Sequence, residues 1–415
     1  MKRIFNSGAF FVFLSVIGPG LITSLADNDA GGITTYSIAG AHFGYSMLWS
    51  LIPITIALVF IQEMCARMGV VTGKGLADLI RESFGLKITF FVMIGLLFAN
   101  FFTTMSEFAG IAASGEIFGM SKYVIVPLSA ALIFLLILKS NYKSLERVFF
   151  ILSIFYVSYI LSGFFAKPDW GLVAKETFAP TIKLTTGYII ILIGVIGTTI
   201  TPWMQFYLQS SIVEKGIRLE EYKYTRLEVI ISSILTSLVS FFIIVAAAST
   251  LFVNKIRIND AADAAVALAP LVGNFAQSLF ALGLFAAAFF GAFIIPLATA
   301  FYICEALGWE SGVNKKFKDA KQFYVLLFLI ISIAMAIVLI PNIPLVKLMV
   351  ASQVINGILL PIVLISMLLI INNEKIMGKY KNSASYNIVV WAASIIIILL
   401  TLLMVATTLF PGILG

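Results

Sequence analysis

Two aspartates, separated by a single residue, interrupt the first long apolar stretch of the chain within the segment SLADNDAGGITT, residues 24–35. One ionisable side chain at the centre of a membrane-spanning helix costs about 2.5–3.5 kcal/mol to insert, so Asp27 and Asp29 both need compensating partners. Carboxylate oxygens, together with backbone carbonyls left free where a helix ends, are ligands that hard cations prefer. Gly31 and Gly32 permit an unwound backbone beside them. The segment predicts a cation site; the alternative is that an aspartate only caps a half-helix.

A second apolar stretch is interrupted at GTTITPWMQ, residues 197–205. Pro202 removes a helical hydrogen bond and frees backbone carbonyls near Thr198, although a proline kink without function would look the same. Irregular backbone inside a membrane is tolerated where it lines a cavity enclosed by protein, so we expect the two breaks to face each other. Glutamine side chains could supply neutral oxygens there, or hydrogen bonds between helices. The candidates are Gln205, Gln209 and Gln353.

Three glutamates also lie in or near apolar stretches, and they differ in depth. Glu107, in TTMSEFAG, lies deep within its stretch and is a candidate for a proton or ion relay. Glu63 precedes Arg67 by four residues, which predicts an ion pair on one helix face at the membrane edge. Glu305 lies similarly near the end of a later stretch. Glu107 is therefore the glutamate that could assist the aspartates.

The chain has one histidine and two cysteines, too few for most metal sites built from these residues. The single histidine, His42, falls at the end of the first apolar stretch, so a histidine relay or a histidine-rich site for Zn²⁺, Cu²⁺ or Ni²⁺ is not expected. Cys65 and Cys304 form no CxxC pair, and we expect neither a disulfide nor an iron–sulfur site. The sequence predicts no resident cofactor.

The composition defines the elements that must carry these residues. Of the 415 residues, 61% are hydrophobic and 11% are charged, whereas about 25% are charged in soluble domains. The net charge of +7 comes from short basic clusters between apolar stretches, which indicate membrane topology rather than a nucleic-acid surface. We expect an all-α polytopic protein in the lipid bilayer with about eleven spans. The expected spans are residues 9–42, 46–68, 86–119, 122–138, 145–166, 184–212, 227–253, 275–306, 322–340, 344–372 and 386–411.

Basic residues predict the orientation of these spans. Most of the 27 Lys and Arg residues fall on the side of the N-terminus, which predicts a cytoplasmic N-terminus in the plasma membrane. Because the number of spans is odd, the C-terminus is expected outside. The largest external loops are then residues 168–181 and 254–273, and neither is large enough for an extracellular domain. The basic residues expected outside are Lys122, Lys167, Lys175, Lys183, Lys255, Arg257 and Lys347.

The two interrupted stretches open two halves of five spans. This pattern predicts one transmembrane domain, residues 1–415, built from an inverted repeat of residues 9–166 and 184–372 with an extra span at 386–411. In inverted-repeat transporters the substrate binds near the midplane, where the paired helices unwind. No soluble segment interrupts the pattern, and no obligate protein partner is expected. The architecture favours the transport of a cation.

Several motifs resemble the natural resistance-associated macrophage protein (NRAMP) family of metal transporters, over most of the chain. They are GPGLITSLADNDAGG, HFGYSMLW, ARMGVVTGKGLADLIRE, the TPW break, YLQSS and ASQVINGILLPIVLI. The resemblance implies a LeuT-type fold with eleven or twelve spans and a Mn²⁺/Fe²⁺ site between broken spans one and six. It also implies backbone carbonyl ligands at Ala26 and Thr198, and a side-chain ligand at Gln353.

The chain keeps the family's metal-binding motifs only in part. The Asp-Pro-Gly-Asn motif corresponds to DAGG at residues 29–32, so the acid is retained and the amide ligand is lost. The Met-Pro-His motif corresponds to TPW at residues 201–203, which lacks both the thioether and the histidine. A second family histidine corresponds to Gln209. The site is therefore expected to offer oxygen ligands alone.

These changes favour a harder and more hydrated ion. A thioether favours soft transition metals, whereas Thr201 in its place leaves an all-oxygen site. Gly32 enlarges the cavity, which suits Mg²⁺ because this ion dehydrates reluctantly and keeps several waters. We expect uptake of Mg²⁺, with Mn²⁺ also carried, as in the NRAMP-related magnesium transporters, and weak or no proton coupling because the histidines are missing. Asp29 would neutralise part of the ion's charge, and Asp27 would add to this neutralisation or line the approach to the site. Thr201, Gln353 and the carbonyls of Ala26 and Thr198 would hold the ion or its waters.

Three other functions stay open. The first is an ordinary proton-coupled Mn²⁺/Fe²⁺ importer, in which Glu107 and the two aspartates carry protons. The second is a sodium-coupled symporter of organic solutes, which two carboxylates in the first break disfavour for anionic substrates. The third is an intramembrane aspartyl protease, which needs carboxylates on two facing helices, whereas Asp27 and Asp29 share one segment. We therefore expect a transporter rather than an enzyme.

Overall fold

The computed structural model describes residues 18–139, 154–259, 261–268, 273–313 and 315–410. This part of the chain is helical and contains no β-strand. It has eight helical stretches that are long and apolar enough to cross a membrane, together with two shorter apolar helices. One of the eight, Ala30–Thr72, holds parts of two predicted spans. The prediction of an all-α polytopic protein is confirmed; residues 9–17 of the first predicted span and 145–153 of the fifth lie outside the described residues.

The first predicted span is broken, as expected, into α2 (Pro19–Asp27) and α3 (Ala30–Phe43). α2 begins with Pro19, which suits the first position of a helix because no internal hydrogen bond is lost there. α3 begins after Asp29, whose backbone is extended (φ −71°, ψ −179°) and whose side chain caps the helix. Asn28 and Asp29 therefore separate the two half-helices.

The sixth predicted span is broken in the same way, into α10 (Thr186–Thr199) and α11 (Pro202–Glu214). At its start α10 is capped by Thr185, whose hydroxyl accepts a hydrogen bond from the backbone N–H of Tyr188 at 3.3 Å. Pro202 takes the first position of α11, where it cannot extend α10 but can begin a new helix. The predicted break thus has a local cause in the TPW sequence.

The remaining spans are close to the predicted ranges. In the first half they are α4 (Leu48–Thr72), α5 (Leu76–Ile117), α6 (Lys122–Lys139) and α8 (Tyr156–Phe165). In the second half they are α12 (Tyr222–Ala247), α15 (Ala276–Leu307), α16 (Lys321–Val338), α17 (Leu345–Ile371) and α19 (Ala384–Leu409). The shorter elements are η1 (Gly44–Met47), α9 (Trp170–Phe178), η2 (Leu219–Glu221), η3 (Ala248–Phe252), α13 (Ala261–Ala265), η4 (Val266–Leu268), η5 (Gly273–Phe275), α18 (Glu374–Met377) and η6 (Gly378–Tyr380).

Two elements differ from the prediction. α5 begins at Leu76 instead of residue 86, because it consists of two helices joined at Gly85, whose positive φ of 75° favours glycine. The part after Gly85 is the predicted third span. α9 lies in the predicted external loop and was not expected; Asp169 caps it by accepting a hydrogen bond from the backbone N–H of Leu172 at 3.1 Å.

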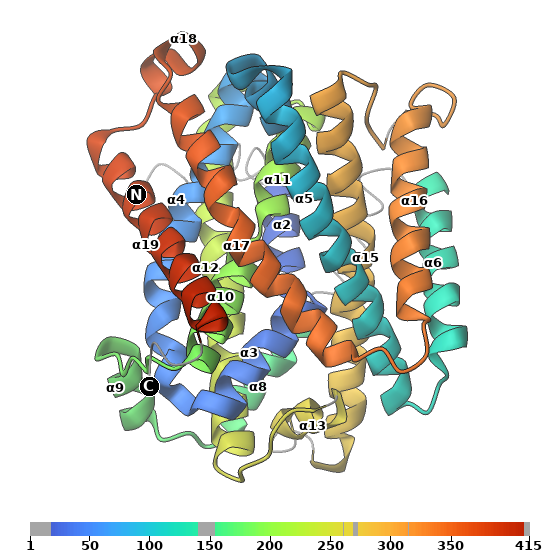
Figure 1. The fold of residues 1–415 in the computed structure, drawn as a ribbon, viewed down its shortest axis with the longest axis vertical. Helices are drawn as coiled ribbons and strands as arrows, with labels where there is room; N and C mark the ends of the chain where they lie inside the picture. Colours follow the sequence, from blue (N-terminus) through green and yellow to red (C-terminus); the bar gives the residue numbers. More distant parts are fainter. Residues whose placement is uncertain (1–17, 140–153, 260, 269–272, 314, 411–415) are drawn as a thin grey trace, which may run out of the picture.

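The two broken helices lie in the middle of the bundle (Figure 1). α3 packs against α10 and α2 packs against α11, while α5, α12, α15 and α17 pack around these four half-helices. The apolar part of the stretch formed by α10 and α11 is 89% buried inside the protein. The corresponding part of α19, which covers α17 and α10 from outside, is only 22% buried. The polar breaks are therefore enclosed by protein, which irregular backbone inside a membrane requires.

Two glycines bring α10 and α17 into backbone contact beside the second break. A Cβ on Gly197 would lie 2.1 Å from the Gln353 carbonyl oxygen and 2.4 Å from the Gly357 nitrogen. A Cβ on Gly357 would lie 2.6 Å from the Ile193 carbonyl oxygen. Close approach at small residues is a common way for helices to pack in membranes. Here it fixes the Gln353 backbone next to the break.

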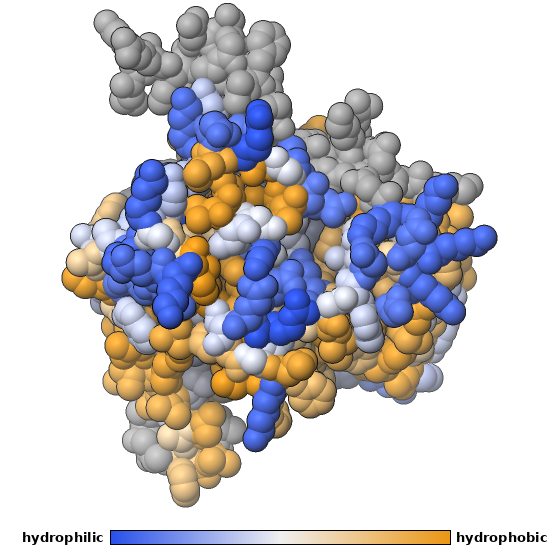
Figure 2. Space-filling view, turned by 90° about the horizontal axis from the view of Figure 1, so that it is seen from above, coloured by the Kyte–Doolittle hydropathy of each residue, from blue (hydrophilic) through white to orange (hydrophobic). Residues whose placement is uncertain are grey.

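Hydrophilic side chains gather at one end of the bundle, which Figure 2 shows from the top of Figure 1. This end holds α18 and the first turns of α5 and α16. The basic loops that join these helices therefore meet on one face. Ion pairs there join Lys74 to Glu82 at 2.7 Å, Arg81 to Asp78 at 3.0 Å and Lys381 to Glu374 at 3.0 Å.

Candidate metal site

Asp29 lies in the gap between α2 and α3 and is 1% exposed. Its Oδ1 atom accepts a hydrogen bond from the backbone N–H of Gly32 at 2.5 Å. A carboxylate at this position also interacts favourably with the dipole of α3. Because a carboxylate has about four lone-pair sites, capping leaves Asp29 able to bind a further group. The capping role and the role in a cation site are therefore compatible.

Three oxygens meet beside Gly32. A Cβ on Gly32 would lie 2.8 Å from Thr198 Oγ1, 3.0 Å from the backbone oxygen of Asp27 and 3.1 Å from Asp29 Oδ1. We call this space the Gly32 cradle. Within the described ranges, Thr198 Oγ1 has no hydrogen-bond partner. A hydroxyl, a carbonyl and a carboxylate around one small space form the kind of ligand set that Mg²⁺, Mn²⁺ and Ca²⁺ prefer.

The cradle has a single carboxylate, and its other oxygens are neutral. Among the residues that the structure describes, no group of three or more His, Cys, Asp or Glu side chains is arranged to hold a metal ion. A cation in the cradle would therefore need water to complete its coordination. This suits an ion that retains part of its hydration shell.

Gln353 reaches Asp29 from α17. Its Nε2 atom donates to both carboxyl oxygens of Asp29, at 3.2 and 3.3 Å. Its Oε1 atom accepts a hydrogen bond from Asn356 Nδ2 at 3.1 Å. The structure thus brings the predicted glutamine to the predicted aspartate, with the amide hydrogens rather than the oxygen facing the carboxylate.

Glu107 lies beside Asp29 on α5. Its Oε2 atom accepts a hydrogen bond from the backbone N–H of Ala30 at 3.2 Å, and its carboxyl group is close enough to Asp29 to interact with it electrostatically. A Cβ on Gly291 of α15 would lie 2.4 Å from Glu107 Oε2, so the glycine leaves room for the acid. The candidate relay residue is therefore adjacent to the cradle.

Asp27 contributes its backbone oxygen to the cradle, while its side chain faces α12. The hydroxyl of Thr236 donates to Asp27 Oδ2 at 3.4 Å. Asn28 links the same elements, because its Nδ2 donates to Thr236 Oγ1 at 2.6 Å and its Oδ1 accepts from the Ser240 hydroxyl at 3.1 Å. The Asp27 carbonyl therefore lies beside Gly32, and the expectation that the Asp27 carboxylate helps to neutralise the ion or lines its approach stays a prediction.

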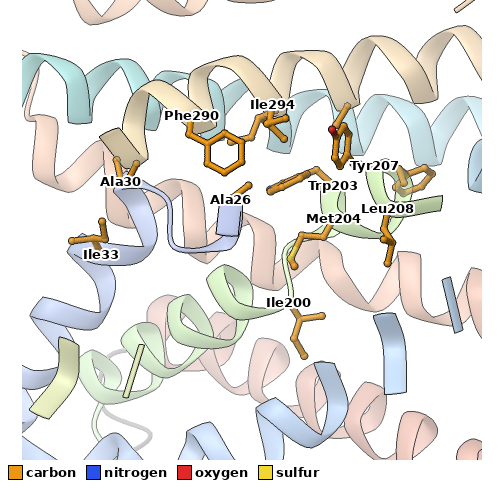
Figure 3. Close-up of a cluster of buried hydrophobic side chains, with 14 of the residues drawn as sticks. Ala26, Ala30, Ile33, Ile200, Trp203, Met204, Tyr207, Leu208, Phe290 and Ile294 are labelled. Carbon is orange, nitrogen blue, oxygen red and sulfur yellow. The ribbon is translucent and has the colours of Figure 1, made fainter. Parts of the chain in front are cut away.

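Ala26 is placed differently from the expectation. Its side chain lies in a buried apolar cluster with Trp203 and Phe290, as Figure 3 shows. The backbone oxygen nearest to the Gly32 cradle belongs to the following residue, Asp27. Because the last four carbonyls of a helix lack partners within it, the Ala26 carbonyl at the end of α2 is also free, and its role as a ligand stays a prediction.

Thr201 and Thr198 present different groups from those that the resemblance implied. The Thr201 hydroxyl donates to the Thr198 carbonyl oxygen at 2.8 Å, so the expected side-chain group and the expected carbonyl are bonded to each other. The cause is the extended backbone of Thr201 (φ −72°, ψ 135°), which precedes Pro202 and turns the hydroxyl back to the end of α10. The hydroxyl that lines the cradle is that of Thr198.

The other two candidate glutamines form hydrogen bonds outside the cradle. Gln209 Nε2 donates to the Lys74 carbonyl oxygen at 2.8 Å, which joins α11 to the loop before α5. In the amide orientation that satisfies both ends of the group, Gln205 donates to the carbonyl oxygens of Thr201 and Pro202 at 2.7 and 2.8 Å. Both residues therefore have structural partners.

The glutamates near the membrane edge also have local partners. Glu63 Oε2 lies 3.2 Å from Arg67 Nη2, which confirms the predicted ion pair. Glu305 Oε1 accepts a hydrogen bond from the Ser210 hydroxyl at 2.5 Å and so joins α15 to α11. Glu63 is thus paired within its own helix, and Glu305 links two helices. The two free thiols, those of Cys65 and Cys304, are buried.

Glu228 on α12 was not predicted to have a role. It is 1% exposed, and its Oε1 atom accepts hydrogen bonds from the backbone N–H groups of Gly18 at 2.8 Å and Leu21 at 2.9 Å. The carboxyl group therefore satisfies the free N–H groups at the start of α2. It anchors the half-helix whose other end lines the cradle. The sequence does show an acid near the start of the seventh predicted span, but the residues around it do not indicate that it bonds to the start of α2.

Fold and site together define a class of protein: a multi-pass helical membrane protein of LeuT type, with an oxygen-lined space where two broken helices meet. The chain belongs to the natural resistance-associated macrophage protein-like family, whose sequence model matches residues 20–407.

Known proteins of this kind match nearly the whole chain. The divalent metal cation transporter MntH of Klebsiella pneumoniae is 27% identical over 406 residues, which are 94% of each chain, and that of Yersinia pestis is 26% identical over 377 residues, 88% of each. Among solved structures, a manganese transporter of Eremococcus coleocola in complex with an aromatic bis-isothiourea substituted compound has a TM-score of 0.77 at 19% identity, covering 97% of this chain and 89% of that one. The nucleobase-cation-symport-1 family transporter MHP1 has a TM-score of 0.54 at 13% identity, covering 95% and 91%. The chain is a divalent metal cation transporter.

Proposed function

We propose that this transporter takes up Mg²⁺, and also Mn²⁺, as a largely hydrated ion bound at the Gly32 cradle. The observation that carries the proposal is the cradle itself, in which Thr198 Oγ1, the Asp27 carbonyl and Asp29 Oδ1 all lie within 3.1 Å of the position that a Cβ on residue 32 would take. Asp29 would neutralise part of the ion's charge, and the neutral oxygens would bind the ion or its waters. One carboxylate without sulfur favours a hard ion over a soft one.

Uptake would be driven by the membrane potential, which supplies about 4.6 kcal/mol for two charges at 100 mV. Weak or absent proton coupling is supported by the residues at the two positions where the family resemblance implies histidines. Trp203 is buried in the apolar cluster of Figure 3, and Gln209 is hydrogen-bonded to the Lys74 carbonyl. Neither side chain titrates near neutral pH.

We extend the proposal to topology and internal symmetry. The N-terminus would be cytoplasmic and the C-terminus external, and residues 9–166 and 184–372 would form the two inverted halves. The gathering of hydrophilic side chains at one end of the bundle supports the orientation. The packing of α2 on α11 and of α3 on α10 supports the pairing of the two broken helices.

A second candidate is a proton-coupled Mn²⁺/Fe²⁺ importer. The observation that favours it is Glu107, a buried acid bonded to the backbone N–H of Ala30, the residue that follows Asp29. In that case Glu107 would carry a proton as the metal crosses.

Uptake into proteoliposomes separates the two candidates. Vesicles with the full chain, a Mg²⁺- or Mn²⁺-sensitive dye and a pH-sensitive dye inside are given an inside-negative potential. We expect Mg²⁺ and Mn²⁺ influx without acidification of the lumen, and the same absence of acidification in Glu107→Gln. Uptake of Mn²⁺ with exclusion of Mg²⁺ at millimolar concentration would contradict the proposed selectivity. Acidification that Glu107→Gln removes would establish the second candidate instead.

A further inference from the structure

The Gln353 side-chain amide directs its NH₂ group, a hydrogen-bond donor, toward Asp29 in the candidate site. Its Nε2 atom lies 3.2 and 3.3 Å from the two carboxyl oxygens of Asp29, and its Oε1 atom is bonded to Asn356 Nδ2 at 3.1 Å. An amide NH₂ group donates hydrogen bonds and cannot be a cation ligand, whereas the amide oxygen can. In this arrangement Gln353 occupies one side of Asp29 in place of a cation.

A buried hydrogen-bond chain holds the amide in this orientation. Asn356 Nδ2 also donates to Thr103 Oγ1 at 3.0 Å, and the Thr103 hydroxyl lies 3.4 Å from Asn356 Oδ1. Gln353, Asn356 and Thr103 are all 0% exposed, so each polar atom must find its partner inside the protein. The direction of the Gln353 amide is therefore determined by Asn356.

Contact between helix backbones limits the ways in which Gln353 can become a ligand. The Gln353 carbonyl oxygen and the Gly357 nitrogen lie where a Cβ of Gly197 would be, at 2.1 and 2.4 Å from that position. Tightly packed backbones do not shift without a cost. The change available to Gln353 is then rotation of its terminal amide, which exchanges the NH₂ group and the oxygen.

Rotation of one amide requires rotation of the next. If Gln353 turns its oxygen toward a cation, its NH₂ group faces Asn356 and needs an acceptor there. Asn356 provides one when its own amide turns and presents Oδ1. The Thr103 hydroxyl both donates and accepts, so it can satisfy Asn356 in either orientation. The reversed chain keeps the contacts among Gln353, Asn356 and Thr103, while the Thr103 proton leaves the Ala99 carbonyl oxygen, to which it is donated at 3.0 Å, for Asn356 Oδ1.

We propose that Asn356 is a positioning residue for transport, and that the Gln353 and Asn356 amides reverse together when a divalent cation binds. In the empty site the Gln353 NH₂ group satisfies Asp29, and in the occupied site the Gln353 oxygen faces the ion. The return of the NH₂ group to Asp29 competes with the ion and assists its release. This inference rests on the proposed binding of the ion at Asp29.

Asn356→Asp tests the inference, because an ionised carboxylate can only accept hydrogen bonds. It therefore favours the orientation in which the Gln353 NH₂ group points toward residue 356 and the Gln353 oxygen points toward Asp29. Mn²⁺ binding to the purified full chain is measured by calorimetry, with Asn356→Asp made in the wild-type and Gln353→Leu backgrounds. We expect Asn356→Asp to lower the Kd for Mn²⁺ about tenfold when Gln353 is present. When Gln353 is replaced by leucine, the Kd should fall about threefold at most, and this smaller change is the effect of the added charge alone. It should also slow transport at saturating Mn²⁺, because release is hindered.

Two further variants complete the test. Asn372→Asp is the matched control, since it adds the same charge to the C-terminal end of the same helix, where Asn372 bonds to Asn387 at 2.8 Å; its Kd should stay within about twofold of wild type. Asn356→Leu, which adds no charge, should change the Kd about threefold or more with Gln353 present and by less than about twofold without it.

Equal effects of the Asn356 variants in both backgrounds would overturn the inference, because Asn356 would then act through charge or packing alone. Unchanged Mn²⁺ affinity in Asp29→Ala would overturn the proposed site instead. The two failures are therefore distinguishable in the same experiment.

Discussion

Replacing Asp29 with alanine is expected to lower divalent cation uptake by about 100-fold or more, because the cradle loses its carboxylate. Asp29→Asn is expected to be as inactive. An asparagine can still accept the hydrogen bond from the Gly32 N–H and cap α3, so this variant removes the charge and keeps the cap. Initial rates of Mg²⁺ and Mn²⁺ uptake into proteoliposomes measure both variants.

Asp169→Ala is the matched control for this prediction. Asp169 caps α9 through the backbone N–H of Leu172 in the way that Asp29 caps α3, but it lies far from the cradle. Its loss should leave uptake near the wild-type rate. If Asp29→Asn transports like wild type while Asp29→Ala does not, capping is the role of Asp29 and the cation site lies elsewhere.

Gly32→Ala is expected to weaken cation binding about tenfold or more, because its methyl group fills the cradle. The new Cβ would lie 2.8 Å from Thr198 Oγ1 and 3.0 Å from the Asp27 backbone oxygen, closer than nonbonded carbon and oxygen atoms normally approach. The Kd for Mn²⁺ and the melting temperature in detergent are measured together, so that loss of affinity is separated from loss of stability.

Gly95→Ala serves as the control in the same fold. Its new Cβ would meet only Leu359, at 3.8 Å, which is an ordinary contact. Affinity and melting temperature should both stay close to wild type. A Gly32→Ala protein that folds and binds Mn²⁺ as tightly as wild type would show that the ion does not use the cradle.

The sequence was sufficient where the cause of a feature is local. Two acids in an apolar stretch predicted the first break, and the TPW sequence predicted the second, because Pro202 cannot continue a helix. The other spans were predictable for the same reason, since each is a continuous apolar stretch between more polar loops. Even the start of the third span was correct, because Gly85 separates it from the preceding helix.

The details of the candidate site depend on geometry that local sequence does not specify. Thr198 lines the cradle with its hydroxyl rather than its carbonyl, because the extended backbone at Thr201 turns a second hydroxyl onto that carbonyl. Of the free carbonyls in the last turn of α2, the one beside Gly32 is likewise that of Asp27, one residue after Ala26. Such shifts of one residue are below the resolution of a pattern of apolar and polar positions.

Contacts between distant residues left no signal in the sequence. Asn356 meets Thr103 across 253 positions of the chain, and Glu228 meets Gly18 across 210. Each of these polar residues is individually compatible with a hydrogen bond between any two helices. Only the packing of α17 on α5 and of α12 on α2 selects the partners.

The most direct test of the central claim, that a divalent cation binds at the Gly32 cradle, is anomalous scattering from crystals of the full chain soaked in Mn²⁺. The account predicts an anomalous peak between the two helix breaks, within coordination distance of Asp29 or of waters bound to it, facing Thr198 Oγ1 and the Asp27 carbonyl. A peak at another group of acids, such as Glu305 at the end of α15, with none beside Gly32, would contradict it.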